Sequence, residues 1–273
     1  MFRLRWSAAT AAVLMTLVAT AGCSSGAAAT AKQSALQRVT KDKVLKVATE
    51  QGNPPYSSVA AGGGVKGFDI DIVDGIAKAL GAKVQYSYVN DAGRIAALQT
   101  GKVDLVAANF TITPERALNV GFTQPYLVVR GELLTKANEA GLKTLEDVNK
   151  PSVRIAVTRG GTAQQNVAKA VPKATAVVFN SVADCVQALT SGQVDAISQD
   201  QLFNAGMVRD HPGQYKPIKG YISTEQIGLG YQKGDLEWAQ WLNIFLRDYN
   251  ASGTQGYDFE KWFGFAMPSL TGQ

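Results

Sequence analysis

The chain has 273 residues, of which 46% are hydrophobic and 18% are charged. This is the composition of a soluble globular protein with one large or two small domains, and it excludes disordered and fibrous architectures. One histidine and two cysteines are too few for a Cys/His zinc centre, which argues against a zinc enzyme. We expect no metal and no cofactor. The net charge is +5 and the basic residues are scattered singly, which argues against a nucleic-acid partner.

The first 22 residues have the pattern of a secretory signal peptide. Two arginines precede an apolar stretch from Ala8 to Ala21, which is too short to cross a roughly 30 Å hydrocarbon core. The small residues Thr20-Ala21-Gly22 before Cys23 resemble the lipobox of bacterial lipoproteins, with Thr20 standing where a leucine is usual. This resemblance implies lipidation of Cys23 and anchoring to the outer face of the cytoplasmic membrane. An ordinary signal peptide with a later cleavage site is the alternative.

Residues 23–42 are expected to form a flexible tether. They are small and polar, without apolar periodicity, so the folded body is expected to begin near Lys43. If Cys23 holds lipid, Cys185 has no intramolecular disulfide partner. Cys185 lies within the amphipathic stretch from Val182 to Leu189, which predicts a buried structural thiol.

Strands and helices alternate along the folded body. The patterns predict a strand over 44–49, a hairpin from 56–58 to 65–68, a helix over 69–80, a strand over 83–89, a helix over 93–99 and a strand over 103–108. Such alternation is typical of helices that cover a mainly parallel sheet.

Part of this pattern occurs twice. ALQTGKVD at 97–104 recurs as ALTSGQVD at 188–195, and the strand at 45–48 has a counterpart at 153–157. Two repeats in the same order predict two similar α/β lobes. The amphipathic stretch 236–246 is expected to return to the first lobe, so that two crossings between the lobes form a hinge.

Four loops are candidates for the binding site. Ligands of open α/β sheets bind outside the carboxyl ends of the strands. This rule selects two loops from each half, 50–56 and 109–116 from the first and 159–162 and 199–201 from the second. The expected site is therefore a cleft between the lobes.

The loop 109–116 has the features of an anion site. Thr113 is expected to cap a helix with Pro114 at its first position, which leaves free backbone amides pointing into the cleft. Arg116 in that first turn opposes the helix dipole, and its guanidinium would clamp a carboxylate. The alternative is an ion pair with Glu115 or another surface acid.

The facing lobe supplies Gly161, Thr162 and Asp200. The glycine allows close backbone approach and the threonine adds a hydroxyl, so that both would complete the anion site. Asp200 ends a predicted strand over 194–198, and together with Thr111 and Glu50 it would hold an ammonium group. Capping of the following helix is the alternative role for Asp200.

Six motifs carry a family resemblance. They are LKVATE (45–50), GFDIDI (67–72), ALQTGKVD (97–104), TITPER (111–116), FTQPY (122–126) and YDFEKWFG (257–264). Together they resemble the family 3 extracellular solute-binding proteins of polar amino-acid ABC transporters. The resemblance implies a two-lobed periplasmic-binding-protein fold of type II, in the α/β class, with the ligand cleft between lobes joined by a two-strand hinge. Lobe 1 would comprise residues 43–126 and 229–267, and lobe 2 residues 131–224.

The same resemblance implies roles for single residues. Thr111 and Arg116 match α-carboxylate binders, and Gly161 and Thr162 match the loop that closes on the carboxylate. Asp200 matches the acid that pairs with the α-ammonium, and Asn109 matches a residue that supplies backbone contacts toward it. Glu50 stands where many members carry a first-lobe aspartate. The remaining expected ligand-binding residues are Asn53, Tyr56, Asp91, Arg94, Phe110, Arg159 and Gln199.

Four positions bear on the identity of the ligand side chain. Asn53 and Asp91 stand where family members often have aromatic residues that sandwich the ligand. Arg94 matches an arginine that contacts the side-chain carboxylate in glutamate- and aspartate-binding members, which favours glutamate, aspartate or glutamine. Glu50 and Asp91 instead favour a cationic or other polar ligand, and the two interpretations differ in the sign of the local field.

The expected function is that of the monomeric substrate-binding component of an ABC importer, without enzymatic activity. Closure of the cleft around the ligand would be read by a membrane permease. An enzyme similar to cyclohexadienyl dehydratases on the same scaffold is the alternative, with Glu50, Asp91 or Asp200 as general acid or base.

Overall fold

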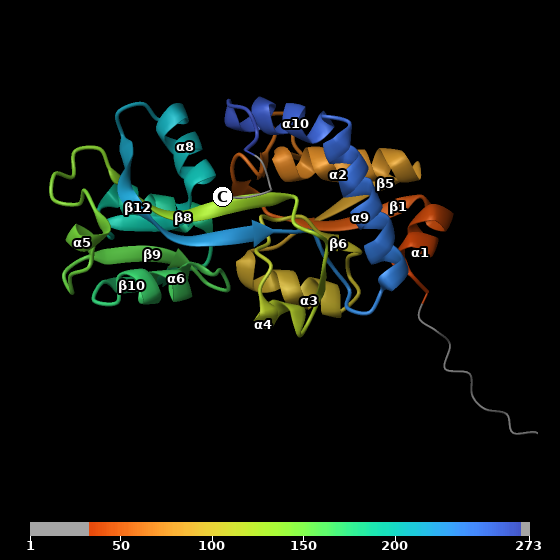
Figure 1. The fold of residues 1–273 in the computed structure, drawn as a ribbon, viewed down its shortest axis with the longest axis horizontal. Coiled ribbons are helices and arrows are strands. Elements are labelled where there is room, and N and C mark those ends of the chain that lie inside the picture. Colours follow the sequence, from red (N-terminus) through yellow and green to blue (C-terminus); the bar gives the residue numbers. More distant parts are fainter. Residues whose placement is uncertain (1–32, 269–273) are drawn as a thin grey trace, which may run out of the picture. The chain divides into compact units, whose positions relative to one another are not determined.

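The structure is a computed structural model that describes residues 33–268, and it contains two five-stranded sheets (Figure 1). The first sheet has the order β5-β1-β6-β13-β7. Its strands are β1 (Val44–Thr49), β5 (Lys83–Tyr88), β6 (Leu105–Val106), β7 (Gly121–Phe122) and β13 (Gly230–Tyr231). β1 pairs in parallel with β5 and β6, whereas β13 is antiparallel to β6 and β7. The mainly parallel sheet expected from the strand and helix alternation is therefore present.

Helices from both ends of the described chain surround this first sheet. They are α1 (Ala35–Asp42), α2 (Phe68–Leu80), the 3₁₀ turn η1 (Asp91–Gly93), α3 (Arg94–Gln99), α4 (Pro114–Ala117), α9 (Leu236–Ala251) and α10 (Thr254–Phe263). A small sheet of β2 (Gly52–Asn53), β3 (Ser57–Val59) and β4 (Val65–Lys66) contains the predicted hairpin. α9 and α10 confirm that the end of the chain returns to the first lobe (Figure 1).

The expected tether needs a correction. Residues 35–42 form α1, which Ser34 caps, and the Ser34 hydroxyl and the Ala35 amide donate to the Asp235 carboxylate at 2.7 Å each. Val39 is fully buried. Val39, the partly buried Ala35 and Leu36 that pack against the same core, and the Asp235 contact order a segment whose composition alone predicts flexibility. The expected signal peptide, Cys23 and the first part of the tether lie outside the described residues.

The second sheet has the order β10-β9-β11-β8-β12. Its strands are β8 (Leu127–Lys136), β9 (Arg154–Thr158), β10 (Thr175–Phe179), β11 (Ala196–Asp200) and β12 (Tyr215–Ile227), and its helices are α5 (Leu145–Val148), α6 (Ala163–Ala170), α7 (Val182–Ser191) and α8 (Gln201–Asp210). β9 is parallel to β10 and β11, as β1 is to β5 and β6. Cys185 on α7 is fully buried, as predicted.

β8 and β12 connect the two lobes. They pair antiparallel along most of their length, from Tyr215 opposite Lys136 to Ile227 opposite Leu127. At the first-lobe end, the Ile112 amide donates to the Gln226 carbonyl at 2.8 Å. Figure 1 shows the two strands running side by side from one lobe to the other. They form the two-strand hinge that the family resemblance implied.

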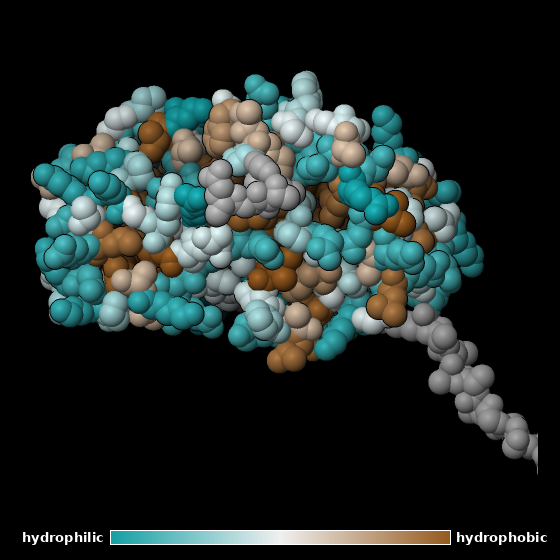
Figure 2. Space-filling view, in the orientation of Figure 1, coloured by the Kyte–Doolittle hydropathy of each residue, from teal (hydrophilic) through white to brown (hydrophobic). Residues whose placement is uncertain are grey.

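The core explains how the lobes hold their shape. α2 buries one apolar face and, at its start, Phe68 packs against Phe259 and Phe263 of α10 at ring-centroid distances of 5.7 and 5.4 Å. The outer face drawn in Figure 2 is mostly hydrophilic, with apolar side chains in small groups. In the part of the chain that the structure describes, no helix combines the length and apolar character needed to cross a membrane.

Candidate functional site

A cavity of about 60 Å³ lies between the lobes. Its lining includes nine of the expected site residues: Asn53, Asp91, Arg94, Asn109, Thr111, Gly161, Thr162, Gln199 and Asp200. Seven of them come from the four loops selected by the strand-end rule, so the cavity lies where that rule placed it, whereas Asp91 and Arg94 come from η1 and the start of α3, after β5. Since one water needs about 10 to 15 Å³ by this measure, the cavity has room for several waters.

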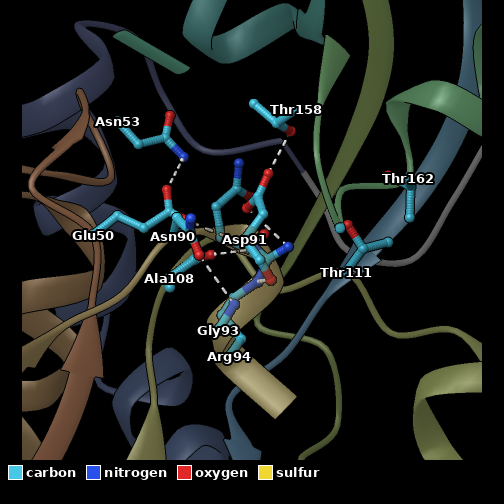
Figure 3. A network of polar contacts seen from close by, with 12 residues as sticks. Glu50, Asn53, Asn90, Asp91, Gly93, Arg94, Ala108, Thr111, Thr158 and Thr162 are labelled. Atoms are coloured by element: carbon cyan, nitrogen blue, oxygen red, sulfur yellow. Dashed lines mark hydrogen bonds and ion pairs between the residues drawn. The ribbon is translucent and has the colours of Figure 1, made fainter. Parts of the chain in front are cut away.

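Arg94 is the centre of a buried ionic cluster (Figure 3). Its side chain is 3% exposed, and its guanidinium lies 2.8 Å from the Asp91 carboxylate and 3.7 Å from that of Glu50. It also donates to the Ala108 carbonyl at 2.9 Å. Asp91 in turn accepts a hydrogen bond from Thr158 of the other lobe. The Arg94 charge is therefore balanced by carboxylates of the protein itself.

Glu50 and Asp91 respond to this cluster in opposite directions. Burial raises the pKa of Glu50 well above its usual range, and the Asp91 charge raises it further. Burial also opposes ionisation of Asp91, but the Arg94 charge and hydrogen bonds from Glu50 and Thr158 hold its pKa below the usual range. The pair thus favours a protonated Glu50 beside an ionised Asp91.

Asp200 joins the two lobes from the end of β11. One carboxylate oxygen accepts from the Tyr56 hydroxyl at 2.7 Å and from the first amides of α8, and the other accepts from the Asn109 side chain at 3.1 Å. Asp200 is therefore the cap of α8, the alternative raised from sequence, and it also lines the cavity. Burial raises its pKa above the usual range, and the hydrogen bonds oppose that rise.

Asp69 is a buried acid that holds Asn109 in place. It accepts the Asn109 amide and the Tyr126 hydroxyl at 2.7 Å each, while Asn109 has a left-handed φ of 44° that asparagine tolerates. Burial raises the pKa of Asp69 to about 6. The sequence analysis recognised Asp69 only as part of a family motif, because a charged residue in the first turn of a helix is usually a surface residue.

Arg116 differs from expectation in its contacts. Its guanidinium donates to the carbonyls of Thr111 at 2.6 Å and Gly160 at 2.9 Å, and thereby links the lobes. Burial and the charge of Arg94 lower the pKa of Arg116 to about 10. The prediction that this helix start leaves free backbone amides is wrong. α4 is a single turn, and the Thr113 hydroxyl accepts a hydrogen bond from the Arg116 amide. The alternative role, an ion pair with Glu115, is not among the ion pairs of residues 33–268.

Glu225 on β12 occupies the middle of the expected anion site. The Thr111 hydroxyl donates to it at 2.8 Å and the Thr162 hydroxyl at 2.9 Å, and Asn166 of α6 donates as well. Figure 3 shows Thr111 and Thr162 facing each other across the gap beside the Arg94 cluster. The sequence reasoning missed Glu225 because the strand-end rule does not select a residue within a crossing strand.

Five expected residues do not line the cavity. Glu50, Tyr56, Phe110 and Arg116 lie directly behind the lining, each joined to a lining residue, whereas Arg159 points away. Arg159 is exposed and donates to Asn180 at 3.3 Å. Its direction follows from strand alternation, since the preceding Thr158 faces the cavity. Within residues 33–268, no group of three or more His, Cys, Asp or Glu side chains is arranged to hold a metal ion.

The comparisons with known proteins agree with this geometry. The sequence model of the bacterial extracellular solute-binding proteins, family 3, matches residues 45–265. A glutamine-binding protein of an ABC transporter from Bacillus subtilis (strain 168) is 34% identical over 203 residues, which cover 73% of either chain.

Solved structures of related proteins give the same result. An ancestral amino acid-binding protein, a precursor of cyclohexadienyl dehydratase, is 35% identical with a TM-score of 0.79, covering 84% of this chain and 100% of that one. An ancestral arginine-binding protein bound to glutamine is 34% identical with a TM-score of 0.76, covering 82% and 99%. Both share the two-lobed fold.

Proposed function

This chain belongs to the bacterial extracellular solute-binding proteins of family 3, and we propose that it binds a polar L-amino acid in the cavity between its lobes. The observation that carries the proposal is the presence, in one cavity, of a buried acid and a set of anion-binding donors. Asp200 would pair with the α-ammonium group. Thr111, Thr162 and the Arg116 charge would hold the α-carboxylate, since neutral donors beside a guanidinium suit a carboxylate.

We propose further that the ligand side chain is an amide or a cation. The carboxyl groups of Asp69, Asp91 and Asp200 outnumber the two guanidinium groups of the site. Arg94 is already paired with Asp91, so it has little positive field left for an acidic side chain. Of the ligands expected from the sequence, glutamine therefore remains a candidate, whereas glutamate and aspartate do not. The cationic alternative becomes a candidate together with glutamine. Relatives named for glutamine and arginine are consistent with this choice, whereas a relative named for glutamate is 27% identical.

A titration tests the ligand class. The protein is unfolded and refolded to remove carried-over ligand, and then titrated by calorimetry with L-glutamine, L-arginine, L-lysine and L-glutamate. We expect saturable binding of glutamine or a cationic amino acid, with glutamate at least about tenfold weaker, a difference of about 1.4 kcal/mol. The melting temperature should rise with the bound ligand. Tighter binding of glutamate would contradict the charge argument.

The role is proposed to be delivery to the permease of an ABC importer rather than catalysis. The three candidate acids are engaged: Glu50 with Asn53, Asp91 with Arg94 and Asp200 with α8. A dehydratase would need one of them to exchange a proton with its substrate. If no amino acid binds, assays of dehydratase activity would be the next experiment, because one structural relative is a precursor of such an enzyme.

Lipid anchoring at Cys23 remains a proposal from the sequence. The expected form is a monomeric lipoprotein on the outer face of the cytoplasmic membrane, cleaved before Cys23. Mass spectrometry of the N-terminal peptide from membranes should show a lipidated Cys23, and Cys23→Ala should release the protein from the membrane fraction. An unmodified peptide that begins at a later residue would instead support an ordinary signal peptide.

A further inference from the structure

Four side chains donate hydrogen bonds to the Glu225 carboxylate. Thr111 donates to one oxygen at 2.8 Å, Thr162 donates to both at 2.9 Å, and Asn166 and Ser223 donate to the other, Ser223 at 3.1 Å. These donors come from the first lobe, the second lobe and the hinge strand. The carboxylate therefore links all three parts of the molecule at one point.

The surroundings of Glu225 are those of a carboxylate-binding site. The donors are neutral hydroxyl and amide groups, and the Arg116 charge acts on the same place, since Glu225 is one of the acids that raise the Arg116 pKa against the effect of burial. Among residues 33–268, Arg116 has no acid within ion-pair distance. Its positive field is thus available to a carboxylate bound by Thr111 and Thr162.

We infer that Glu225 is a built-in substitute for the α-carboxylate of the ligand, which an amino acid must displace in order to bind. The inference rests on the proposed function, because it uses the same donors for the ligand. Two carboxylates cannot share Thr111 and Thr162, since each hydroxyl has one proton to donate. The negative charges of Glu225 and the ligand α-carboxylate would also repel each other if both bound the same two hydroxyl groups.

The consequence is a lowered affinity that depends on the hinge. Only the fraction of molecules in which Glu225 has left the donors is competent to bind, so the measured Kd exceeds the intrinsic Kd by the inverse of that fraction. Glu225 lies on β12, two residues before Ile227, which bridges to Thr111. The ligand carboxylate therefore replaces a contact of the hinge strand itself, which couples occupancy of the site to the hinge.

The test compares Glu225→Gln with wild type and with Glu132→Gln. Glutamine keeps the shape but loses the charge-assisted hydrogen bonds, so it competes less well. Glu132 is a matched control, a partly buried acid of neighbouring β8 that accepts from Asn204 at 3.1 Å and does not line the cavity. We expect Glu225→Gln to bind L-glutamine or L-arginine at least about tenfold more tightly, and Glu132→Gln to bind like wild type.

Ligand analogues show whether the gain comes from the α-carboxylate. The α-amides of glutamine and arginine lack that charge, so Glu225→Gln should bind them no more tightly than wild type does. Equal or weaker binding of the free amino acids by Glu225→Gln would overturn the inference while leaving the proposed function intact. Loss of arginine binding alone would show that Glu225 pairs with a cationic side chain instead, and would also overturn it.

A second variant tests the donors without any amino acid. Glu225→Ala leaves the donors without their carboxylate, so acetate at tens of millimolar should raise its melting temperature. Wild type should not respond, and chloride at equal ionic strength serves as the control. If acetate has no greater effect than chloride on Glu225→Ala, the donors do not form a carboxylate site and the inference fails. A response to acetate in a protein that binds no amino acid would support the inference while contradicting the proposed function.

Discussion

Replacing Asp200 with Asn is expected to weaken amino-acid binding by about 2 to 5 kcal/mol, or roughly 30-fold or more in Kd. The reason is that a buried ammonium group would lose its only direct carboxylate partner in the proposed binding mode. Titration calorimetry of the variant with the ligand found for wild type measures the loss. Unchanged affinity would remove Asp200 from the binding site and leave it as a helix cap.

The same substitution is expected to leave the unliganded fold intact. Asn caps helices as well as Asp does, so the Leu202 and Phe203 amides keep an acceptor. The Asn109 side-chain oxygen, which has no hydrogen-bond partner within the described residues, can turn toward the new amide. Asp235→Asn is the matched control, since Asp235 caps α9 away from the cavity. It should lower neither the affinity nor the binding stoichiometry.

Replacing Arg94 with Met is expected to lower the free energy of unfolding by about 3 to 5 kcal/mol, because it leaves buried carboxyl groups without their cation. Arg94 is 3% exposed and Glu50 is 6% exposed. Urea unfolding at pH 7 measures the change. Adding Asp91→Asn should recover part of the loss, since the unpaired charge is then removed.

A surface pair provides the comparison for Arg94. Arg154 forms an ion pair with Asp195 at 2.9 Å, but its side chain is 43% exposed, so Arg154→Met should lower the free energy of unfolding far less than Arg94→Met does. The effect of Arg94→Met should also shrink at acidic pH. Because folding lowers the pKa of Asp91, its ionised form stabilises wild type at any pH above the pKa that Asp91 has in the unfolded chain. This stabilisation is lost as the pH falls through the lower pKa of the folded protein. Equal costs for both arginines would contradict the buried-cluster interpretation.

Local patterns predicted the elements that position the site. The alternating patterns predicted β1, α2 and β5 to within a residue at each end, because α2 has a long apolar period between Gly67 and Gly81 and the two strands are short runs rich in β-branched and aromatic residues. The repeat of residues 97–104 at 188–195 correctly indicated two lobes. The tether was wrong over residues 35–42, because a short polar helix is stabilised by contacts with Asp235 that no local pattern records.

The sequence by itself determined the fold class, the family motifs and the four loops that meet at the cavity, because these depend on periodicity, turn residues and the direction of parallel strands. The tertiary structure decided which charges balance one another. The approach of Glu50 to Arg94, the hydrogen bond from Thr158 to Asp91 and the entry of Glu225 among the donors of Thr111 and Thr162 all join segments far apart in the chain. Electrostatic interactions depend on distance and burial, and both are fixed only when the two lobes and their hinge pack together.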